Sequence, residues 1–341
     1  TRIGAIYALS RIADDSPQRD SRAVVDTLSE FIREPPYRSE VNSRRYRRDR
    51  HENPDKSSRK NEEIAVLCPD VRAALDVLQS IVSDNVLIAG EKKYYLNFSR
   101  AYLRELDLTE ASFRCSDLSY ADFSFSVLIR ASILDANLTY ADMTGVKAMS
   151  SCLSGATLKA TDFYGANVSF ADLSGANLSG ANLAQSTFYK TNLSHSHANN
   201  CNFKGADFRK SDFSDANLTG SEFSRAYLQG ADFSRAELSE ADFSNAVLAQ
   251  ANLTSANLER ANFTDANFGY AVVRNADFEF AQLVGANFQS AILEGAFLDT
   301  ADGLSQEQLD AALPGPSPAS LPSGLKWPFE LRDSKWVKIG D

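Results

Sequence analysis

Few side chains in this sequence belong to the types that carry out catalysis or bind metal ions. The 341 residues include only three histidines, His51, His195 and His197, and the last two stand near Cys201 in the stretch HSHANNC. Histidine and cysteine at such short spacing are typical zinc ligands. The sequence holds no Walker motif, nucleophile elbow or GxGxxG fingerprint, and its four cysteines form no CxxC pair. We therefore predict no catalytic residues and no enzyme.

The carboxylates follow a regular spacing, because Asp122, Asp142 and Asp162 recur every 20 residues. Two carboxylates that lie close together can act as a general acid and a general base. These aspartates, however, belong to a repeat that fills the middle of the chain. We interpret any two carboxylates that lie close together as neighbours in that repeat. The structure of the repeat then determines in which direction each carboxylate side chain points.

The repeat has a period of five residues, as in ANLTSANLERANFTDANF at residues 251–268. Large apolar residues run from Phe98 to Leu298 in 41 consecutive units, and 35 of these residues are Leu or Phe. An α-helix would spread this pattern over all its faces, because five residues turn it through about 500°. A straight strand fails as well, because an odd period sends successive large residues to opposite faces. The chain must turn once per unit and wind a solenoid with its apolar residues inside.

The units Ala-Asp/Asn-Leu/Phe-x-x resemble the pentapeptide-repeat family over about 205 residues. The resemblance implies an all-β solenoid, a right-handed four-sided β-helix with four pentapeptides per coil and about ten coils. At about 4.8 Å per stacked strand, the rod would be about 48 Å long. We place the rod at residues 93–303, after an α-helical module at 1–92 and before a cap helix and tail at 304–341.

The solenoid determines where the candidate metal ligands and the aspartates lie relative to one another. His195 and His197 fall on outward positions and Cys201 on an inward one, so they do not converge on one ion, and we predict no metal and no cofactor. Asp122, Asp142 and Asp162 should stack on one face as an acidic ladder. We expect at least one raised pKa in this ladder, most of all for the middle carboxyl, unless Arg130 or Lys147 neutralises it.

The two ends of the chain differ from the rod. Apolar residues Ile3, Ile6, Tyr7 and Ile12 predict a first helix, and similar patterns predict helices near residues 21–34 and 69–85. A polar segment at about 36–63 is strongly basic, and its arginines are candidates for an arm that contacts anionic lipid or nucleic acid: Arg44, Arg45, Arg47, Arg48 and Arg50. A solvated loop is the alternative. At the C-terminal end, LSQEQLDAALPG predicts a capping helix with Ser305 as its N-cap.

Several outward positions near the end of the rod hold apolar residues where Asn or Asp is usual. They are candidate contacts for a partner or a second copy of the chain: Tyr227, Val247, Val272, Ile292 and Phe297. The chain carries a net charge of −10, and residues 96–300 alone account for −9. We expect no direct binding of nucleic acid by an acidic rod.

Two functions remain open from the sequence. The first is a rigid, non-enzymatic protein-interaction scaffold in the cytoplasm, or at the cytoplasmic face of a membrane if membrane-spanning segments precede the N-terminal helices, as in some bacterial relatives. The second follows from the resemblance: some pentapeptide-repeat proteins mimic DNA, bind type II topoisomerases such as gyrase, and protect them against inhibitors. B-DNA of the same length would carry about 28 charges. The smaller charge of the rod favours the scaffold.

Overall fold

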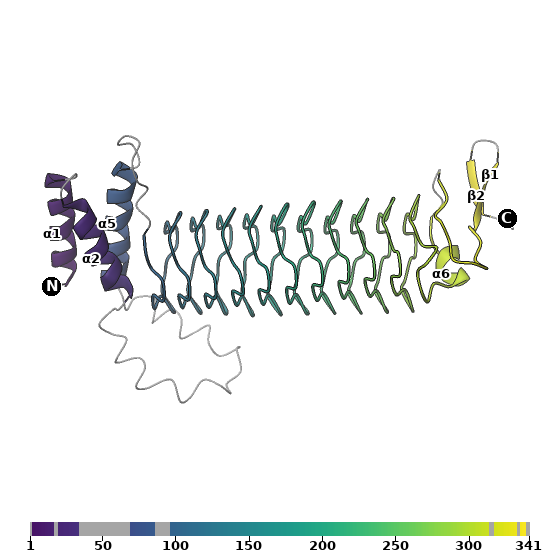
Figure 1. Ribbon diagram of the computed structural model, residues 1–341, viewed down its shortest axis with the longest axis horizontal. Helices are drawn as coiled ribbons and strands as arrows, with labels where there is room; N and C mark the ends of the chain where they lie inside the picture. Colours follow the sequence, from purple (N-terminus) through teal and green to yellow (C-terminus); the bar gives the residue numbers. More distant parts are fainter. Residues whose placement is uncertain are drawn as a thin grey trace, which may run out of the picture.

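A computed structural model describes residues 2–16, 20–33, 69–85, 96–313, 317–332 and 335–338. The described chain is elongated. Three helices lie at one end, a rod of stacked coils forms the middle, and a short helix with a two-stranded hairpin lies at the other end (Figure 1). The rod positions most of the side chains discussed below.

The rod runs through residues 96–303. The second residue of each pentapeptide forms a parallel bridge with the residue 20 positions further along, from Asn97 with Asp117 to Gln282 with Asp302. Backbone N–H groups on both sides of each bridge donate to carbonyl groups of the adjacent coils. One coil therefore takes 20 residues, which is four pentapeptides.

The coils meet through isolated bridges. Within residues 96–303 the structure has no strand of several residues, whereas the sequence pattern predicts stacked parallel strands. The reason is the length of each straight segment. Three residues lie between one two-residue turn and the next, and only the central residue pairs with the neighbouring coil. The bridge pairing is continuous along the rod axis but only one residue wide on each face, and the turns add further hydrogen bonds between coils, such as that from the Arg100 N–H to the Ser119 carbonyl.

Each pentapeptide has three kinds of position, and the unit Ala251 to Ser255 illustrates them. Ala251 and Leu253 point inward and are fully buried, and Asn252 between them is the outward bridging residue. Thr254 and Ser255 form the turn, and Ser255 has a positive φ of 57°. We call these the inward, bridging and turn positions.

The inward positions form one continuous core. Every large position from Phe98 to Leu298 is at most 1% exposed. Phenylalanines 20 residues apart stack in a column: the ring centroids of Phe203 and Phe223 are 4.5 Å apart, and those of Phe223 and Phe243 are 4.7 Å apart. The five-residue period therefore does place its apolar residues inside the rod.

Three helices precede the rod: α1 (Arg2–Asp15), α2 (Ser21–Arg33) and α5 (Pro69–Asn85). They pack against one another, and Arg72 of α5 donates from Nη1 to the backbone carbonyl of Thr109 in the rod at 2.8 Å. The apolar stripe expected on α1 is partly wrong. Ile6 is buried, but Tyr7 and Ile12 are 54% and 46% exposed.

The error on α1 has a simple geometric cause. Ile6 and Ala13 are seven residues apart, so they lie on one line of the helix, and both are buried. Tyr7 and Ile12 lie to either side of that line and reach solvent. The expected basic arm and His51 fall outside the described residues.

Helix α6 (Gln306–Asp310) covers the far end of the rod. Ser305 is its N-cap, as expected: its hydroxyl accepts from the backbone N–H of Gln308, whose side chain accepts from the backbone N–H of Ser305. The Gln308 amide also donates to the backbone carbonyls of Leu283 and Ala286, at 2.8 Å each. The helix thus satisfies the Ala286 carbonyl, which has no coil beyond it to bond, and adds a second bond to the Leu283 carbonyl.

A hairpin follows that the sequence analysis did not foresee. Strand β1 (Phe329–Arg332) pairs antiparallel with β2 (Lys335–Lys338). The Trp327 ring meets the Phe329 ring at 5.7 Å and packs against the core, and Lys338 Nζ donates to the backbone carbonyl of Asp310 at 3.1 Å. The hairpin therefore extends the cap beyond α6.

Candidate functional site

The acidic ladder lies on one face of the rod. Asp122 bridges Asp142, and Asp142 bridges Asp162, so the three residues stack in successive coils. The same column continues with a mixture of amides and carboxylates: Asn182, Asn202, Glu222, Asp242 and Asn262. We call this the carboxylate–amide column.

The carboxylates of this column close the turns that follow them. Asp122 Oδ1 accepts from the backbone N–H of Ser124 at 2.9 Å and from its hydroxyl at 2.5 Å. Asp162 Oδ1 accepts from the backbone N–H of Tyr164 and from the side-chain amide of Asn182, each at 2.9 Å. Side-chain oxygens that bond the backbone two residues on are typical of Asx turns. Turn formation therefore explains much of the aspartate content of the rod.

One carboxyl of the ladder has a shifted pKa. Burial raises the pKa of Asp122, the two hydrogen bonds from Ser124 oppose the rise, the neighbouring carboxylate of Asp142 adds to it, and the Arg104 guanidinium lowers it. Arg104, rather than the expected Arg130 or Lys147, is thus the cation beside the ladder. Arg130 instead pairs with Glu110 at 2.5 Å.

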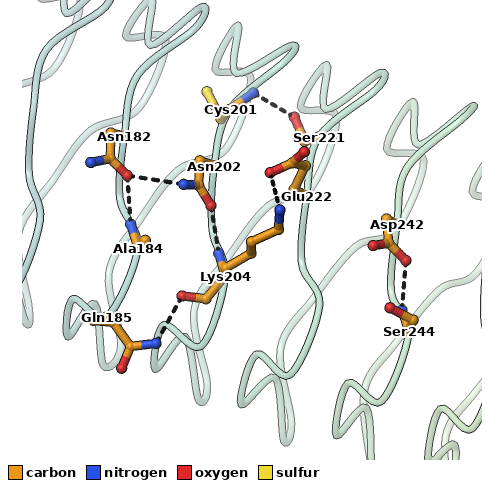
Figure 2. A network of polar contacts seen from close by, with 10 residues as sticks. All are labelled: Asn182, Ala184, Gln185, Cys201, Asn202, Lys204, Ser221, Glu222, Asp242 and Ser244. Atoms are coloured by element: carbon orange, nitrogen blue, oxygen red, sulfur yellow. Dashed lines mark hydrogen bonds and ion pairs between the residues drawn. The ribbon is translucent and has the colours of Figure 1, made fainter.

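A network of polar contacts lies on and beside the carboxylate–amide column (Figure 2). Asn202 donates from Nδ2 to Oδ1 of Asn182 at 3.2 Å, and Lys204 Nζ lies 2.8 Å from Glu222 Oε2. The Glu222 carboxylate raises the pKa of Lys204. The amide ladder and the ion pair hold adjacent coils in register on this face.

A shallow depression of about 300 Å³ opens beside this network, at the corner next to the column. Its lining is polar and consists of turn residues from four coils: Gln185, Lys204, Gly205, Ser224, Arg225, Ser244 and Asn245. Lys204 is held by Glu222, whereas the guanidinium of Arg225 makes no ion pair or hydrogen bond within the described ranges. The depression can receive a polar group of a partner, but it places no nucleophile beside a general base.

The histidines and Cys201 do not come together. Cys201 is buried, its thiol donates to the backbone carbonyl of Leu178 at 3.0 Å, and burial raises its pKa to about 12. His197 occupies a bridging position between Asn177 and Asn217. Among the residues that the structure describes, no group of three or more His, Cys, Asp or Glu side chains could hold a metal ion.

The expected apolar contacts fall on three faces. Val272 bridges Ile292, and Tyr227 bridges Val247, so each pair stacks. Phe297 lies on a further face. Ile292 also bridges Leu313 of the cap segment, so the cap covers part of the end of the rod that an end-to-end dimer would use. The five residues therefore do not form a single patch.

The sequence analysis did not predict one further feature, which lies at a corner of the rod. Turn positions there bring together five residues that we call the basic–aromatic ridge: Phe170, Tyr189, Lys190, Arg209 and Lys210. The 20-residue spacing of Lys190 and Lys210 was the signal that could have revealed it.

The comparisons with known proteins identify the family. The family model described as pentapeptide repeats matches in eight copies, and the matches cover more than half of the chain: residues 96–133, 116–155, 151–188, 187–225, 221–260, 241–279 and 281–303. The chain therefore belongs to the pentapeptide-repeat family, whose members fold as right-handed β-helices. No curated protein sequence matches it.

Solved structures similar to this chain are also pentapeptide-repeat proteins. HetL of Nostoc sp. strain PCC 7120, involved in heterocyst differentiation regulation, is 28% identical and is aligned over 65% of this chain and 97% of its own, with a TM-score of 0.36. QnrB1, a plasmid-mediated fluoroquinolone resistance protein, is 17% identical over 56% of this chain and 90% of its own, with a TM-score of 0.39. A protein of the Arabidopsis thaliana thylakoid lumen is 34% identical over 27% of this chain and 65% of its own, with a TM-score of 0.27.

No helix within the described ranges combines the length and the apolar character that crossing a membrane requires.

Proposed function

We propose that the protein is a non-enzymatic protein-interaction scaffold, built on a β-helical rod of about ten coils between an N-terminal helical module and a C-terminal helical cap. The observation that carries this proposal is the uninterrupted 20-residue bridging from Asn97 to Asp302 around a fully buried core. Such a stack holds outward side chains at a fixed spacing of about 4.8 Å. A partner can therefore bind several coils without first ordering a loop.

The alternative is a DNA mimic that binds gyrase. A similar structure, QnrB1, is a fluoroquinolone resistance protein, and the carboxylate–amide column is an acidic stripe on a rod. Two features favour the scaffold. Residues 96–300 carry a net charge of only −9, against about 28 charges on B-DNA of similar length. In addition, amides interrupt the carboxylates along the column, at Asn182, Asn202 and Asn262.

Two experiments test the proposal. In the first, a photo-reactive amino acid is placed singly at exposed turn positions along the intact chain, and crosslinked proteins are identified in its native cells. A scaffold predicts one recurring partner captured from a contiguous set of positions. Capture of unrelated proteins with equal yield from every position would contradict it.

The second experiment decides between the two functions. DNA supercoiling by purified gyrase is measured with increasing amounts of the intact protein. The scaffold proposal predicts unchanged supercoiling at stoichiometric protein. Inhibition at that level, or protection of gyrase against a quinolone, would establish the alternative instead.

A further inference from the structure

The basic–aromatic ridge is the part of the rod surface whose charge opposes that of the rod. The turn positions of four successive coils at this corner hold Ser169, Phe170, Tyr189, Lys190, Arg209, Lys210, Gln229 and Gly230. Three of these side chains are cations and none is a carboxylate, although residues 96–300 carry a net charge of −9. The ridge therefore presents a local positive surface to any ligand that approaches the acidic rod.

Two aromatic rings form one end of the ridge. Phe170 is 55% exposed, and its ring meets the ring of Tyr189 edge-on at 5.5 Å. The Lys190 ammonium lies 5.6 Å from the centroid of the Tyr189 ring. An apolar surface thus continues directly into the cations, as in sites that bind an apolar side chain beside an acidic one.

The fold itself does not require Phe170. Its φ is 63°, a left-handed conformation that bulky side chains adopt at a free-energy cost, and Gly230 fills the corresponding turn position at the same corner. The Phe170 ring is not part of the buried core. The Phe170 side chain therefore contributes little to the core, and its ring is accessible to a ligand.

The cations differ in their partners. Arg209 donates from Nε and Nη2 to the two carboxylate oxygens of Asp207, at 2.8 and 2.6 Å. Lys190 and Lys210 are exposed and have no carboxylate partner within the described ranges. Two positive charges about one coil spacing apart are therefore available to a ligand.

The charged residues around the basic–aromatic ridge limit which ligands can bind it. The next face carries carboxylates at the same level of the rod: Asp172, Asp212 and Asp232. A long polyanion or a flat anionic membrane would meet these carboxylates as well as the ridge. A short acidic segment would contact the cations alone. From Phe170 to Lys210 the ridge spans two coil spacings, about 10 Å, which is the length of about three extended residues.

We propose that the basic–aromatic ridge binds a short acidic segment of a partner protein, in which an apolar or aromatic residue precedes or follows the carboxylates. The apolar side chain packs on Phe170 and Tyr189, and the carboxylates pair with Lys190 and Lys210. The proposal rests on the scaffold function and gives that scaffold a defined contact.

The test uses the intact protein and four fluorescent probes. The probes are a 12-residue peptide that alternates Asp-Glu with Trp, the same peptide with Lys in place of the acids, a 20-residue oligothymidylate, and phosphatidylserine vesicles. Binding is measured by fluorescence anisotropy for the peptides and the oligonucleotide and by co-sedimentation for the vesicles. We expect the acidic peptide to bind and the other three to bind at least tenfold more weakly.

Matched variants separate the ridge from the overall charge. Lys190→Glu with Lys210→Glu should weaken binding of the acidic peptide at least tenfold, and Phe170→Gly should weaken it about threefold without loss of thermal stability. The control reverses two cations at other corners that make no ion pair with any described residue, Arg114→Glu with Lys159→Glu, and should change binding by less than twofold. Equal losses in the ridge and control variants would overturn the proposal.

The remaining outcomes are equally decisive. Failure of every probe to bind the wild-type protein, or stronger binding of the oligonucleotide or vesicles that depends on Lys190 and Lys210, would reject an acidic peptide as the ligand. Photo-crosslinking then shows whether the scaffold fails too. If the recurring partner is still captured in the ridge variant, the scaffold stands and only the ridge assignment is wrong.

Discussion

The carboxylate–amide column and the basic–aromatic ridge are both charged stripes on one rod, yet their charges are used differently. In the column, the charged atoms of Asp122 and Asp162 accept hydrogen bonds from the turn that follows each residue. On the ridge, Lys190 and Lys210 contact no carboxylate within the described ranges. Bridging positions therefore serve mainly the fold, whereas turn positions are available for partners. If this division holds, substitutions at inward, turn and bridging positions should differ in the size and sign of their effect on stability.

The largest effect among single substitutions should come from an inward position. The Phe223 ring is fully buried and lies between the stacked rings of Phe203 and Phe243. Phe223→Ala should lower the free energy of unfolding by about 3–5 kcal/mol, because it removes a large apolar side chain and leaves a cavity. Urea denaturation measures the change.

Its control lies four residues further along in the same coil. Tyr227→Asn replaces an exposed bridging residue by the residue found at positions 267 and 287 of the same column. It should change the free energy of unfolding by less than about 0.5 kcal/mol. A comparable loss in the two variants would show that outward side chains also hold the rod together.

A smaller, pH-dependent effect on stability is expected for the ion pair between Arg209 of the ridge and Asp207. Burial raises the pKa of Asp207, but the hydrogen bonds and charge of Arg209, with the backbone N–H, outweigh it, so the pKa is lowered. A lowered pKa stabilises the folded state above the unfolded pKa of about 3.9, and the gain is lost as the pH falls through the folded pKa. Arg209→Gln should therefore destabilise the protein at pH 7, and only slightly, because the Arg209 side chain is exposed to solvent.

The same comparison at acid pH provides the check. Thermal unfolding of wild type and Arg209→Gln at pH 7 and pH 2.5 should show a difference at pH 7 that shrinks at pH 2.5. A difference of equal size at both pH values would mean that Arg209 acts through packing and that its ion pair contributes nothing.

The smallest expected effect on stability is at Asp122 of the carboxylate–amide column. Its pH dependence has the opposite sign to that of Asp207. Burial raises the pKa of Asp122, so the folded state loses stability as the pH rises from about 3.9 through the raised value. Asp122→Asn should keep the turn, because Asn137 makes the same contacts with Thr139. It should stabilise the rod at pH 7 by less than about 1 kcal/mol and lose that advantage below about pH 3.

Carbon-13 titration of the Asp122 carboxyl in the wild-type protein gives a direct measurement. We expect its midpoint above that of a free aspartate. A normal midpoint, together with an unchanged stability of Asp122→Asn at pH 7, would contradict the proposed desolvation of this residue.

Much of this fold follows from the sequence because one physical requirement repeats 41 times. Leu or Phe at a fixed phase defines the inward positions, and residues 20 apart, such as Val272 and Ile292, do stack. Ser305 as an N-cap could also be predicted, because a capping side chain acts over three residues. These features depend on local sequence or on a strict period.

Features that depend on longer-range contacts were harder to predict. The exposure of Tyr7 and Ile12 on α1 depends on where α2 and α5 lie, and the sequence does not reveal this. The spacing of the ladder was predictable, but the proximity of Arg104 to Asp122 was not, because it depends on side-chain direction across a corner. The basic–aromatic ridge could be predicted only by applying the 20-residue spacing to the turn positions, and these positions show no apolar pattern.

The central claim is that a coil of four pentapeptides, held by its inward side chains, is the unit of the rod and leaves the outside for partners. Two deletions test it most directly. Removal of residues 251–270 takes out one whole coil and keeps every later residue in its original column. Removal of residues 251–260 takes out half a coil and moves every later column to the opposite face. Circular dichroism and urea denaturation should show a folded protein of nearly unchanged stability for the first deletion and a loss of several kcal/mol for the second. Equal stability of the two proteins would contradict the claim.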